Sequence, residues 1–297
     1  FITNLKLRAS YGKVGNDKLG ATRFLYISNI STGGGVIPSL GRGQAINQGK
    51  LGNPNLGWEE KKEWNLGVDY SFFEGRLYGK FDYYRREVDN LLFSVKVPQP
   101  PYTQGSQMQN IGSMESKGWE FEVGGDIIRT KDFTWSSSMN LSHNTRKILT
   151  LEGDNSYHNG NGFVAPGTPG DAARMEAGST IGSFYMWKFA GFDDEGSFLL
   201  YNKDGEVIPA AQKTENDKQY IGNYTPKLII GWSHTLTYKN FDLGINLRSW
   251  IDFDVYNTIN MYYGIQGQGN LNVLKDAYGK FNHLSLIHIS EPTRPLY

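Results

Sequence analysis

The hydrophobic pattern is clearest between Glu60 and Leu92, where apolar and polar side chains alternate along two arms of the chain. One face of the first arm carries Trp64, Leu66, Val68, Tyr70 and Phe72, and the other carries Glu63, Asn65, Gly67, Asp69 and Ser71. After Glu74-Gly75-Arg76 the second arm resumes the alternation with Leu77, Gly79, Phe81 and Tyr83. A period of two predicts strands with one apolar and one polar side, so this stretch is expected to form a long β-hairpin.

The same pattern predicts a strand before this hairpin and two more hairpins after it. Residues 5–11 alternate, and the later hairpins reverse at Thr130-Lys131-Asp132 and at Lys239-Asn240. Their apolar faces are Trp119, Phe121, Val123, Gly125 and Ile127; Phe133, Trp135, Ser137, Met139 and Leu141; Leu228, Ile230, Trp232, His234 and Leu236; and Phe241, Leu243, Ile245 and Leu247. The sequence therefore predicts about seven strands, each of the length that a membrane-spanning β-strand needs, about 9–11 residues.

The predicted connections alternate between a few residues and dozens. Residues 12–58, 93–116 and 146–225 show no sustained period, and the second region contains Pro98, Pro100 and Pro101, which a central strand would not accept. Short turns on one rim and long loops on the other are typical of an outer-membrane barrel. We therefore expect an all-β fold: an incomplete, antiparallel, up-and-down transmembrane β-barrel segment with long external loops. The pattern alone leaves a soluble β-sandwich open as the alternative.

Composition excludes several other classes of protein. The 297 residues include no cysteine, and 30 basic residues balance 30 acidic ones, so nothing indicates a thiolate metal site or a nucleic-acid partner. There is no run of about 18 apolar residues, which excludes a membrane helix, whereas polar lumen-facing residues are normal in a barrel. The chain starts at Phe1 inside a predicted strand and has no signal sequence, so we expect it to be a fragment.

Five strings of sequence resemble the C-terminal barrel of the SusC/RagA family of TonB-linked outer-membrane transporters. They are LKLRASYGKVGND (5–17), NPNLGWEEKKEWNLGVDYSFFEGRLYGKFDYYRREVDNLL (53–92), QNIGSMESKGWEFEVGGDIIRTKDFTWSSSMNLSHNTRKILTL (109–151), IGSFYMWKFAGF (181–192) and IGNYTPKLIIGWSHTLTYKNFDLGINL (221–247). Their order and spacing match the family over most of the chain.

The resemblance implies a function for the whole protein. Members of the family enclose an N-terminal plug in a large barrel, work with a SusD-like surface lipoprotein, and import oligosaccharides or peptides with energy passed on by TonB. The plug, the TonB box and the strands after about Asp254 have no counterpart here. By resemblance, then, the chain is part of the wall of a cell outer-membrane transporter that is not an enzyme and needs no cofactor.

The end of the chain does not resemble the family. LSLIHISEPTR, at 284–294, looks like the in-frame translation of a sequencing adaptor. We therefore expect residues 1–283 to be the partial barrel and residues 284–297 to be a non-native tail.

Alternation along the strands also predicts which side chains share a face. The residues expected on the convex, lipid-facing side are Trp64, Leu66, Val68, Phe81, Trp119, Phe121, Val123, Leu141, Leu228, Ile230, Leu243 and Ile245. Those expected on the concave side are Asn65, Asp69, Lys80, Asp82, Glu120, Glu122, Ser136, Asn140, Thr235 and Asn246. His234 falls on the lipid-facing side, which predicts either a position near an interface or a neighbour that hydrogen-bonds it.

Two groups in the long third loop are candidate binding residues. Tyr185, Trp187 and Phe189 are expected either to stack on sugar rings or to pack one loop against another. Asn202, Asp204 and Glu206 alternate as calcium ligands do, but no correctly spaced distal glutamate follows, so an ordinary Asp-Gly turn is the competing interpretation. The histidines show no metal-binding spacing.

Two rival functions remain open at this point. A secreted, soluble carbohydrate-binding module or glycan-active enzyme would need one apolar core and short loops at both ends of its strands. A passive porin wall would share the barrel but lack the plug and the lipoprotein partner.

Overall fold

The structure is a computed structural model that describes residues 1–16, 24–36, 44–102, 104–151, 157–159, 172–194, 197–264 and 272–275. The chain divides into two compact units. We call the first the sheet unit; it comprises Phe1–Ser156, Glu176–Gly178 and Trp232–Asn246. The second, the insert unit, comprises Tyr157–Met175, Ser179–Gly231 and Leu247–Tyr297. The predicted adaptor-derived tail lies outside the described residues.

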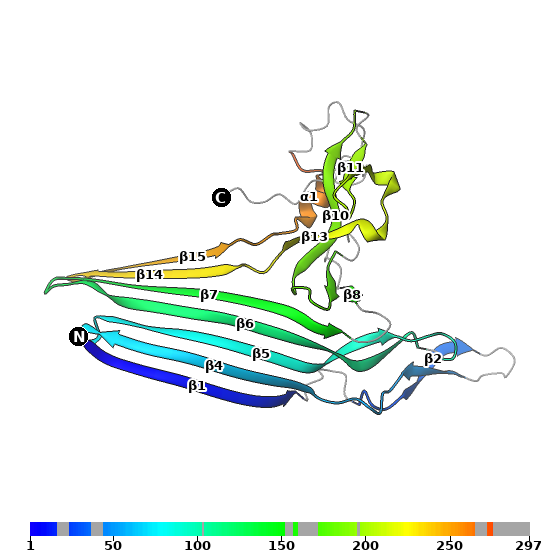
Figure 1. Ribbon diagram of the computed structural model, residues 1–297, viewed down its shortest axis with the longest axis horizontal. Helices are drawn as coiled ribbons and strands as arrows, with labels where there is room; N and C mark the ends of the chain where they lie inside the picture. Colours follow the sequence, from blue (N-terminus) through cyan, green and yellow to red (C-terminus); the bar gives the residue numbers. More distant parts are fainter. Residues whose placement is uncertain are drawn as a thin grey trace. The chain divides into compact units, whose positions relative to one another are not determined.

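Seven long strands form one sheet in the order β1-β4-β5-β6-β7-β14-β15 (Figure 1). Their bounds are β1 Ile2–Asn16, β4 Glu59–Phe72, β5 Leu77–Lys96, β6 Ser106–Arg129, β7 Phe133–Leu151, β14 Leu228–Tyr238 and β15 Phe241–Ile251. From β1 to β7 each neighbouring pair is antiparallel. The predicted all-β, up-and-down arrangement of seven strands is confirmed.

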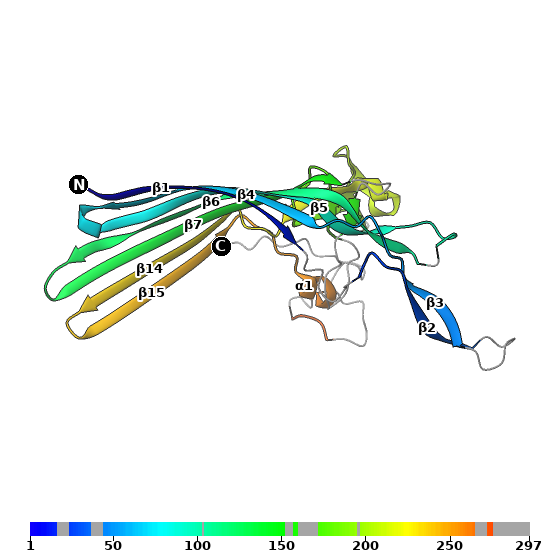
Figure 2. The same cartoon turned by 90° about the horizontal axis from the view of Figure 1, so that it is seen from below.

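The three tight turns lie at one end of this sheet, as predicted (Figures 1 and 2). The first is a short 3-10 helix, η2 Phe73–Gly75, in which Glu74 and Gly75 have positive φ angles. In the second turn, the Thr130 hydroxyl accepts a hydrogen bond from the Phe133 amide. The amide of Lys239 in the third turn donates to the Asp132 carbonyl in the second, over 2.9 Å. This contact fixes the two turns side by side.

The strands run further than the hydrophobic pattern predicted. β5 continues to Lys96, β6 begins at Ser106 and β7 continues to Leu151, so the predicted irregular regions 93–116 and 146–225 were wrong at their edges. Pro98, Pro100 and Pro101 do lie in the connection between β5 and β6. The reason for the error is that backbone pairing continues where the apolar alternation stops. A β-bulge and uncharged polar residues interrupt the alternation in β5 and β6, and Arg146 and Lys147 interrupt it in β7.

The first predicted loop, 12–58, also contains regular structure. β1 extends into it as far as Asn16, and β2 Asn29–Val36 pairs with β3 Gln44–Lys50. The sequences of β2 and β3, NISTGGGV and QAINQGK, do not alternate between apolar and polar residues. Their pairing therefore could not be predicted from alternation.

The insert unit contains short elements in a region that the sequence predicted to be irregular. A four-stranded sheet has the order β12-β11-β10-β13, and β8 pairs with β9. The bounds are β8 Tyr157–Asn159, β9 Arg174–Glu176, β10 Ser183–Phe192, β11 Phe198–Tyr201, β12 Val207–Pro209, η3 Ala210–Gln212, η4 Glu215–Asp217, β13 Lys218–Asn223 and α1 Thr258–Tyr263. Among the described residues, no helix has the length and apolar character needed to span a membrane.

Candidate membrane-facing and lumen-facing surfaces

Cross-strand register places four consecutive rows of uncharged residues on one face of the sheet, from β1 to β7. From the turn end the rows are Ile2, Phe72, Leu77, Gly125 and Ser137; Leu5, Tyr70, Gly79, Val123 and Met139; Leu7, Val68, Phe81, Phe121 and Leu141; and Ala9, Leu66, Tyr83, Trp119 and His143. None of these positions is Asp, Glu, Lys or Arg. We call this surface the apolar band.

The opposite face at the same level is charged. Its rows hold Lys6, Arg8, Asp69, Lys80, Asp82, Glu120 and Glu122, together with Tyr78, Tyr84 and small and amide residues. The two faces therefore differ in charge although they are built from adjacent residues of the same strands. A shift of the register by one residue would exchange them, so the hydrophobic pattern strongly specifies this register.

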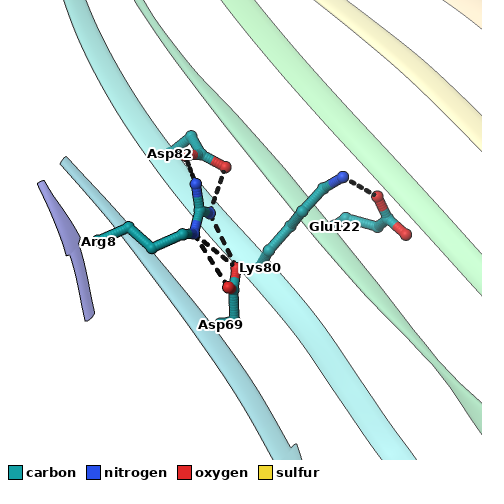
Figure 3. Close-up of polar contacts among 5 residues, drawn as sticks. All are labelled: Arg8, Asp69, Lys80, Asp82 and Glu122. Atoms are coloured by element: carbon teal, nitrogen blue, oxygen red, sulfur yellow. Dashed lines mark hydrogen bonds and ion pairs between the residues drawn. The ribbon is translucent and has the colours of Figure 1, made fainter. Parts of the chain in front are cut away.

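Arg8 is the centre of the charged face (Figure 3). Its guanidinium pairs with Asp69 on β4 at 2.8 Å and with Asp82 on β5 at 2.9 Å. To reach Asp82 it crosses the backbone of Gly67, where an added Cβ would lie 2.6 Å from Asp82 Oδ1 and 2.7 Å from Arg8 Cζ. A side chain at position 67 would therefore displace the Arg8 and Asp82 groups through which one arginine joins three strands.

A second ion pair lies beside this network. Lys80 Nζ on β5 is 3.0 Å from Glu122 Oε2 on β6 (Figure 3). Both side chains are more than a third exposed, so water screens the pair and its contribution to stability is small. Three basic and four acidic residues give this face a net charge of −1, and the exposure of Lys80 and Glu122 shows that this part of it is not a packed core.

Side-chain contacts extend the same two faces to β14 and β15. Trp232 Nε1 donates to Ser137 Oγ at 2.9 Å, which places the even-numbered residues of β14 on the apolar side. On the opposite, charged face, Thr237 Oγ1 donates to Asp242 Oδ1 at 2.7 Å. Asp242 is an even-numbered residue of β15, so the odd-numbered residues of β15 lie on the apolar side. The twelve residues predicted to share one face therefore do so. That this face contacts lipid remains a prediction.

Of the two alternatives that the sequence left open for His234, the structure shows the hydrogen-bonding neighbour. Trp135 Nε1 donates to His234 Nδ1 at 3.3 Å, and the ring of Trp232 lies 4.5 Å from the imidazole ring, centroid to centroid. The predicted hydrogen bond to this residue is confirmed. It removes part of the cost of placing an imidazole on an apolar face.

Aromatic residues mark both ends of the apolar band. At the turn end, the rings of Phe1 and Phe73 are 4.7 Å apart. At the other end, the rings of Trp64 and Tyr83 are 5.6 Å apart. On β4 the stretch from Trp64 to Phe72 is nine residues long, which agrees with the length of strand that crosses a bilayer, about 9–11 residues.

The three aromatic candidates on β10 all pack against protein. Tyr185 accepts a hydrogen bond from Arg174 at 2.6 Å, and its ring is 5.1 Å from that of Tyr220. Trp187 Nε1 donates to the Thr214 carbonyl, and the Lys213 and Lys218 ammonium groups lie near its ring. The ring of Phe189 contacts those of Phe192 and Phe198. These contacts favour packing, and sugar stacking stays an untested prediction.

The calcium candidates form the turn between β11 and β12. The Asn202 side-chain oxygen accepts hydrogen bonds from the amides of Asp204 (3.0 Å) and Glu206 (2.8 Å), and Gly205 has a φ of +84°. Backbone amides thus already use the oxygen that a metal would need, which is the geometry of an Asx turn. This arrangement favours the Asp-Gly turn, and a calcium role stays an untested prediction.

Sequence reasoning did not single out Arg8 or Gly67. Alternation assigned each charge to a face, but it could not show which charges meet across strands. The usable signal was the presence of a glycine in β4 at the centre of a polar face, since an interior strand glycine often marks a close approach of another group.

The sequence and fold of this chain are similar to those of known proteins. The profile of the family described as "TonB dependent receptor-like, beta-barrel" matches residues 1–271. The chain belongs to this family. The chain spans about a quarter of the length of the curated relatives that it matches. TonB-dependent receptor P3 of Formosa agariphila is 33% identical over 275 residues, which are 86% of this chain and 26% of that protein.

Two further similarities point to the same branch of the family. TonB-dependent receptor SusC of Bacteroides thetaiotaomicron is 32% identical over 270 residues, which are 86% of this chain and 26% of that protein. The solved structure of the RagAB peptide importer in the "closed-closed" state matches with a TM-score of 0.75 and 25% identity, covering 91% of this chain and 29% of that one. The resemblance to SusC/RagA proteins is confirmed.

Membership of the family decides between the rival classes. TonB-dependent receptors are transporters rather than enzymes, and they reside in the outer membrane, so the chain is part of an outer-membrane β-barrel. The soluble module or glycan-active enzyme that the sequence pattern left open is therefore not supported.

Proposed function

We propose that the full-length protein imports oligosaccharides or peptides across the outer membrane with energy from TonB and with a SusD-like lipoprotein as its partner. In this protein the chain forms a stretch of barrel wall. The apolar band contacts lipid, and the face that carries Arg8, Asp69 and Asp82 lines the water-filled lumen. Support for the substrate class and the partner comes from the resemblance to SusC and to the RagAB peptide importer.

One observation carries the assignment of the two faces. Four rows without a single charged residue lie back to back with rows that hold seven charged residues. Leu66 in the band and Leu243 on the same side of β15 are 52% and 55% exposed, so the sheet does not bury them itself. A bilayer is the environment that accepts a wide, exposed apolar surface at this level and rejects charge there.

Adjacent positions on β6 test the assignment. Val123→Arg places a charge in the apolar band and should destabilise the inserted barrel by about 2–4 kcal/mol if the site is near the midplane. Glu122→Arg, one residue away on the other face, should leave insertion intact and change only the charge of the lumen. The measurement is the heat-modifiable gel mobility of the full-length protein in isolated outer membranes. Equal loss of folded barrel in both variants would refute the assignment.

A second experiment tests transport. Deletion of the gene should abolish growth on the transported oligosaccharides or peptides, and the full-length protein should copurify with its lipoprotein partner. Deletion of the tonB gene should have the same effect on growth. Uptake that persists without TonB would identify a passive pore instead.

A further inference from the structure

The face that carries the apolar band changes character abruptly beyond it. The next two rows, which we call the collar, are Tyr11, Trp64, Arg85, Lys117 and Thr145, followed by Lys13, Lys62, Glu87, Glu115 and Lys147. Five basic residues stand against two carboxylates, a net charge of +3. The row beyond contains Glu60 and Asp89 and is negative. Lys13 pairs with Glu60 at 2.8 Å and Lys62 pairs with Asp89 at 2.6 Å, so the three rows together carry a net charge of +1. The excess positive charge lies in the two rows next to the apolar band.

Buried and half-buried carboxylates orient the basic groups of the collar. Glu115, only 10% exposed, pairs with Arg85 at 2.7 Å and with Lys117 at 3.4 Å. Glu87 also pairs with Arg85, at 2.6 Å. The Arg85 and Lys117 side chains themselves remain 41% and 49% exposed. The carboxylates of Glu87 and Glu115 hold these two side chains in place, and their exposed N–H groups can still donate hydrogen bonds to a ligand outside the sheet.

A polar hollow lies further along the strands. A β-bulge between Val88 and Leu91 interrupts the pairing of β5 with β6, and Asn90 there has a positive φ angle. The hollow has a volume of about 370 Å³, and Asp89, Asn110, Ser113 and Thr150 contribute to its lining. Carboxylate, amide and hydroxyl groups of this kind suit the hydroxyl groups of a sugar.

We propose that the collar binds the phosphate groups of the glycolipid in the outer leaflet of the outer membrane, and that the hollow receives the adjoining sugar. The order along the strand is apolar band, aromatic and basic row, then polar hollow, and it matches the order of acyl chain, phosphate and saccharide in such a lipid. Barrel loops of this kind face the cell exterior, where the glycolipid lies. The inference rests on the proposed lipid-facing role of the band and adds a specific ligand to it.

The test compares two double variants of the full-length protein. Arg85→Gln with Lys117→Gln removes two charges from the collar. Arg86→Gln with Arg146→Gln removes two charges from the neighbouring row on the opposite face. Each protein is reconstituted in nanodiscs that contain lipopolysaccharide, dephosphorylated lipopolysaccharide or phosphatidylglycerol, and the lipid retained by the protein is quantified by mass spectrometry.

The wild type should retain lipopolysaccharide, and the collar variant should bind it about tenfold more weakly, since each basic group near an anionic surface adds several-fold to affinity. The opposite-face variant should bind lipopolysaccharide as tightly as the wild type does. With dephosphorylated lipopolysaccharide, the wild type and the two variants should all bind equally. Equal lipopolysaccharide binding by the collar variant would overturn the proposal, as would equal retention of phosphatidylglycerol, which offers phosphate without sugar.

Heat-modifiable gel mobility, which reports the folded barrel, distinguishes failure of the collar proposal from failure of the proposed membrane function. A wild-type protein that does not insert as a folded barrel contradicts the membrane assignment itself. A wild-type barrel that inserts but shows no preference for lipopolysaccharide contradicts the collar proposal alone.

Discussion

At the scale of single residues, the sheet repeatedly places a large side chain over a glycine directly across the strand pair. In each case an added Cβ would lie against atoms of the partner side chain. The pairs are Arg8 over Gly67, Tyr70 over Gly79, Tyr84 over Gly118 and Tyr78 over Gly124. A large side chain that covers a strand glycine restores packing that the glycine lacks. Such pairs favour one register over its neighbours.

Gly118→Ala tests this role. The new methyl group would meet the His143 carbonyl and the Tyr84 hydroxyl, and Tyr84 is only 6% exposed and has little room to move. We expect the free energy of unfolding of the full-length barrel to fall by about 1–3 kcal/mol, as for other overpacked sites. Urea-induced unfolding in lipid vesicles, followed by tryptophan fluorescence, measures it.

Gly244→Ala on β15 is the matched control. Among the described residues, apart from its two chain neighbours, none has a heavy atom within 4 Å of a Cβ built there, and Gly244 does not have a positive φ angle. Its effect should stay within about 0.5 kcal/mol. Similar losses in both variants would show that strand glycines matter here for some reason other than close packing.

At the scale of elements, the long strands consist of two parts with different stabilising interactions. Inside the apolar band, cross-strand pairs are mainly apolar and aromatic. Beyond it, ion pairs join neighbouring strands, for example Lys13 with Glu60 at 2.8 Å and Arg86 with Glu63 at 3.0 Å. Exposed pairs of this kind contribute little individually, so the outer parts of the strands depend mainly on backbone hydrogen bonds.

In the insert unit, η4 depends on one carboxylate. Asp217 Oδ2 accepts hydrogen bonds from the Thr214 hydroxyl at 2.7 Å and from the Thr214 amide at 2.8 Å. These bonds favour the ionised form and hold the pKa of Asp217 below its usual value. A carboxyl whose folded pKa is lowered stabilises the fold above its unfolded pKa, about 4, and loses that contribution as the pH falls through the folded value.

Asp217→Asn should therefore weaken this turn at pH 7 and make its stability insensitive to acid. In the unmodified protein, amide protection factors at 214–218 should hold from neutral pH down to about 4 and fall as the pH is lowered further. Hydrogen exchange with mass spectrometry measures them. The exposed carboxyl of Asp204 offers the control, and Asp204→Asn should leave the protection at 214–218 unchanged; an equal effect would argue against the Thr214–Asp217 contacts as the cause.

At the scale of the whole molecule, β1 and β15 each pair with one neighbour, so the sheet has two edges. Unpaired backbone groups at an edge promote association with other chains, and the exposed apolar band does the same. We expect the isolated 297-residue chain to aggregate in water at micromolar concentration and to require detergent. Sedimentation velocity with and without detergent measures this. A soluble, cooperatively unfolding monomer would contradict the membrane assignment.

Period-two alternation determined a large part of this structure in advance. It identified seven strands, three tight turns and the side chains that share each face, because side chains of a strand must point alternately to its two sides. Once the faces carry different charge, a register slip of one residue is excluded, whereas a slip of two residues would keep the same faces. Alternation therefore placed Val68, Phe81, Phe121 and Leu141 on one face, and the structure shows that they also share one row.

Only the tertiary structure decided which residues meet across strands and where regular structure continues without an apolar pattern. The Arg8 bridge over Gly67, the Trp135 hydrogen bond to His234 and the collar around Glu115 each join residues that are distant in the chain. The outer parts of β5, β6 and β7 and the short strands of the insert unit carry mixed polar sequences. Backbone hydrogen bonds hold them, and because nearly every residue type supplies those bonds, composition does not reveal them.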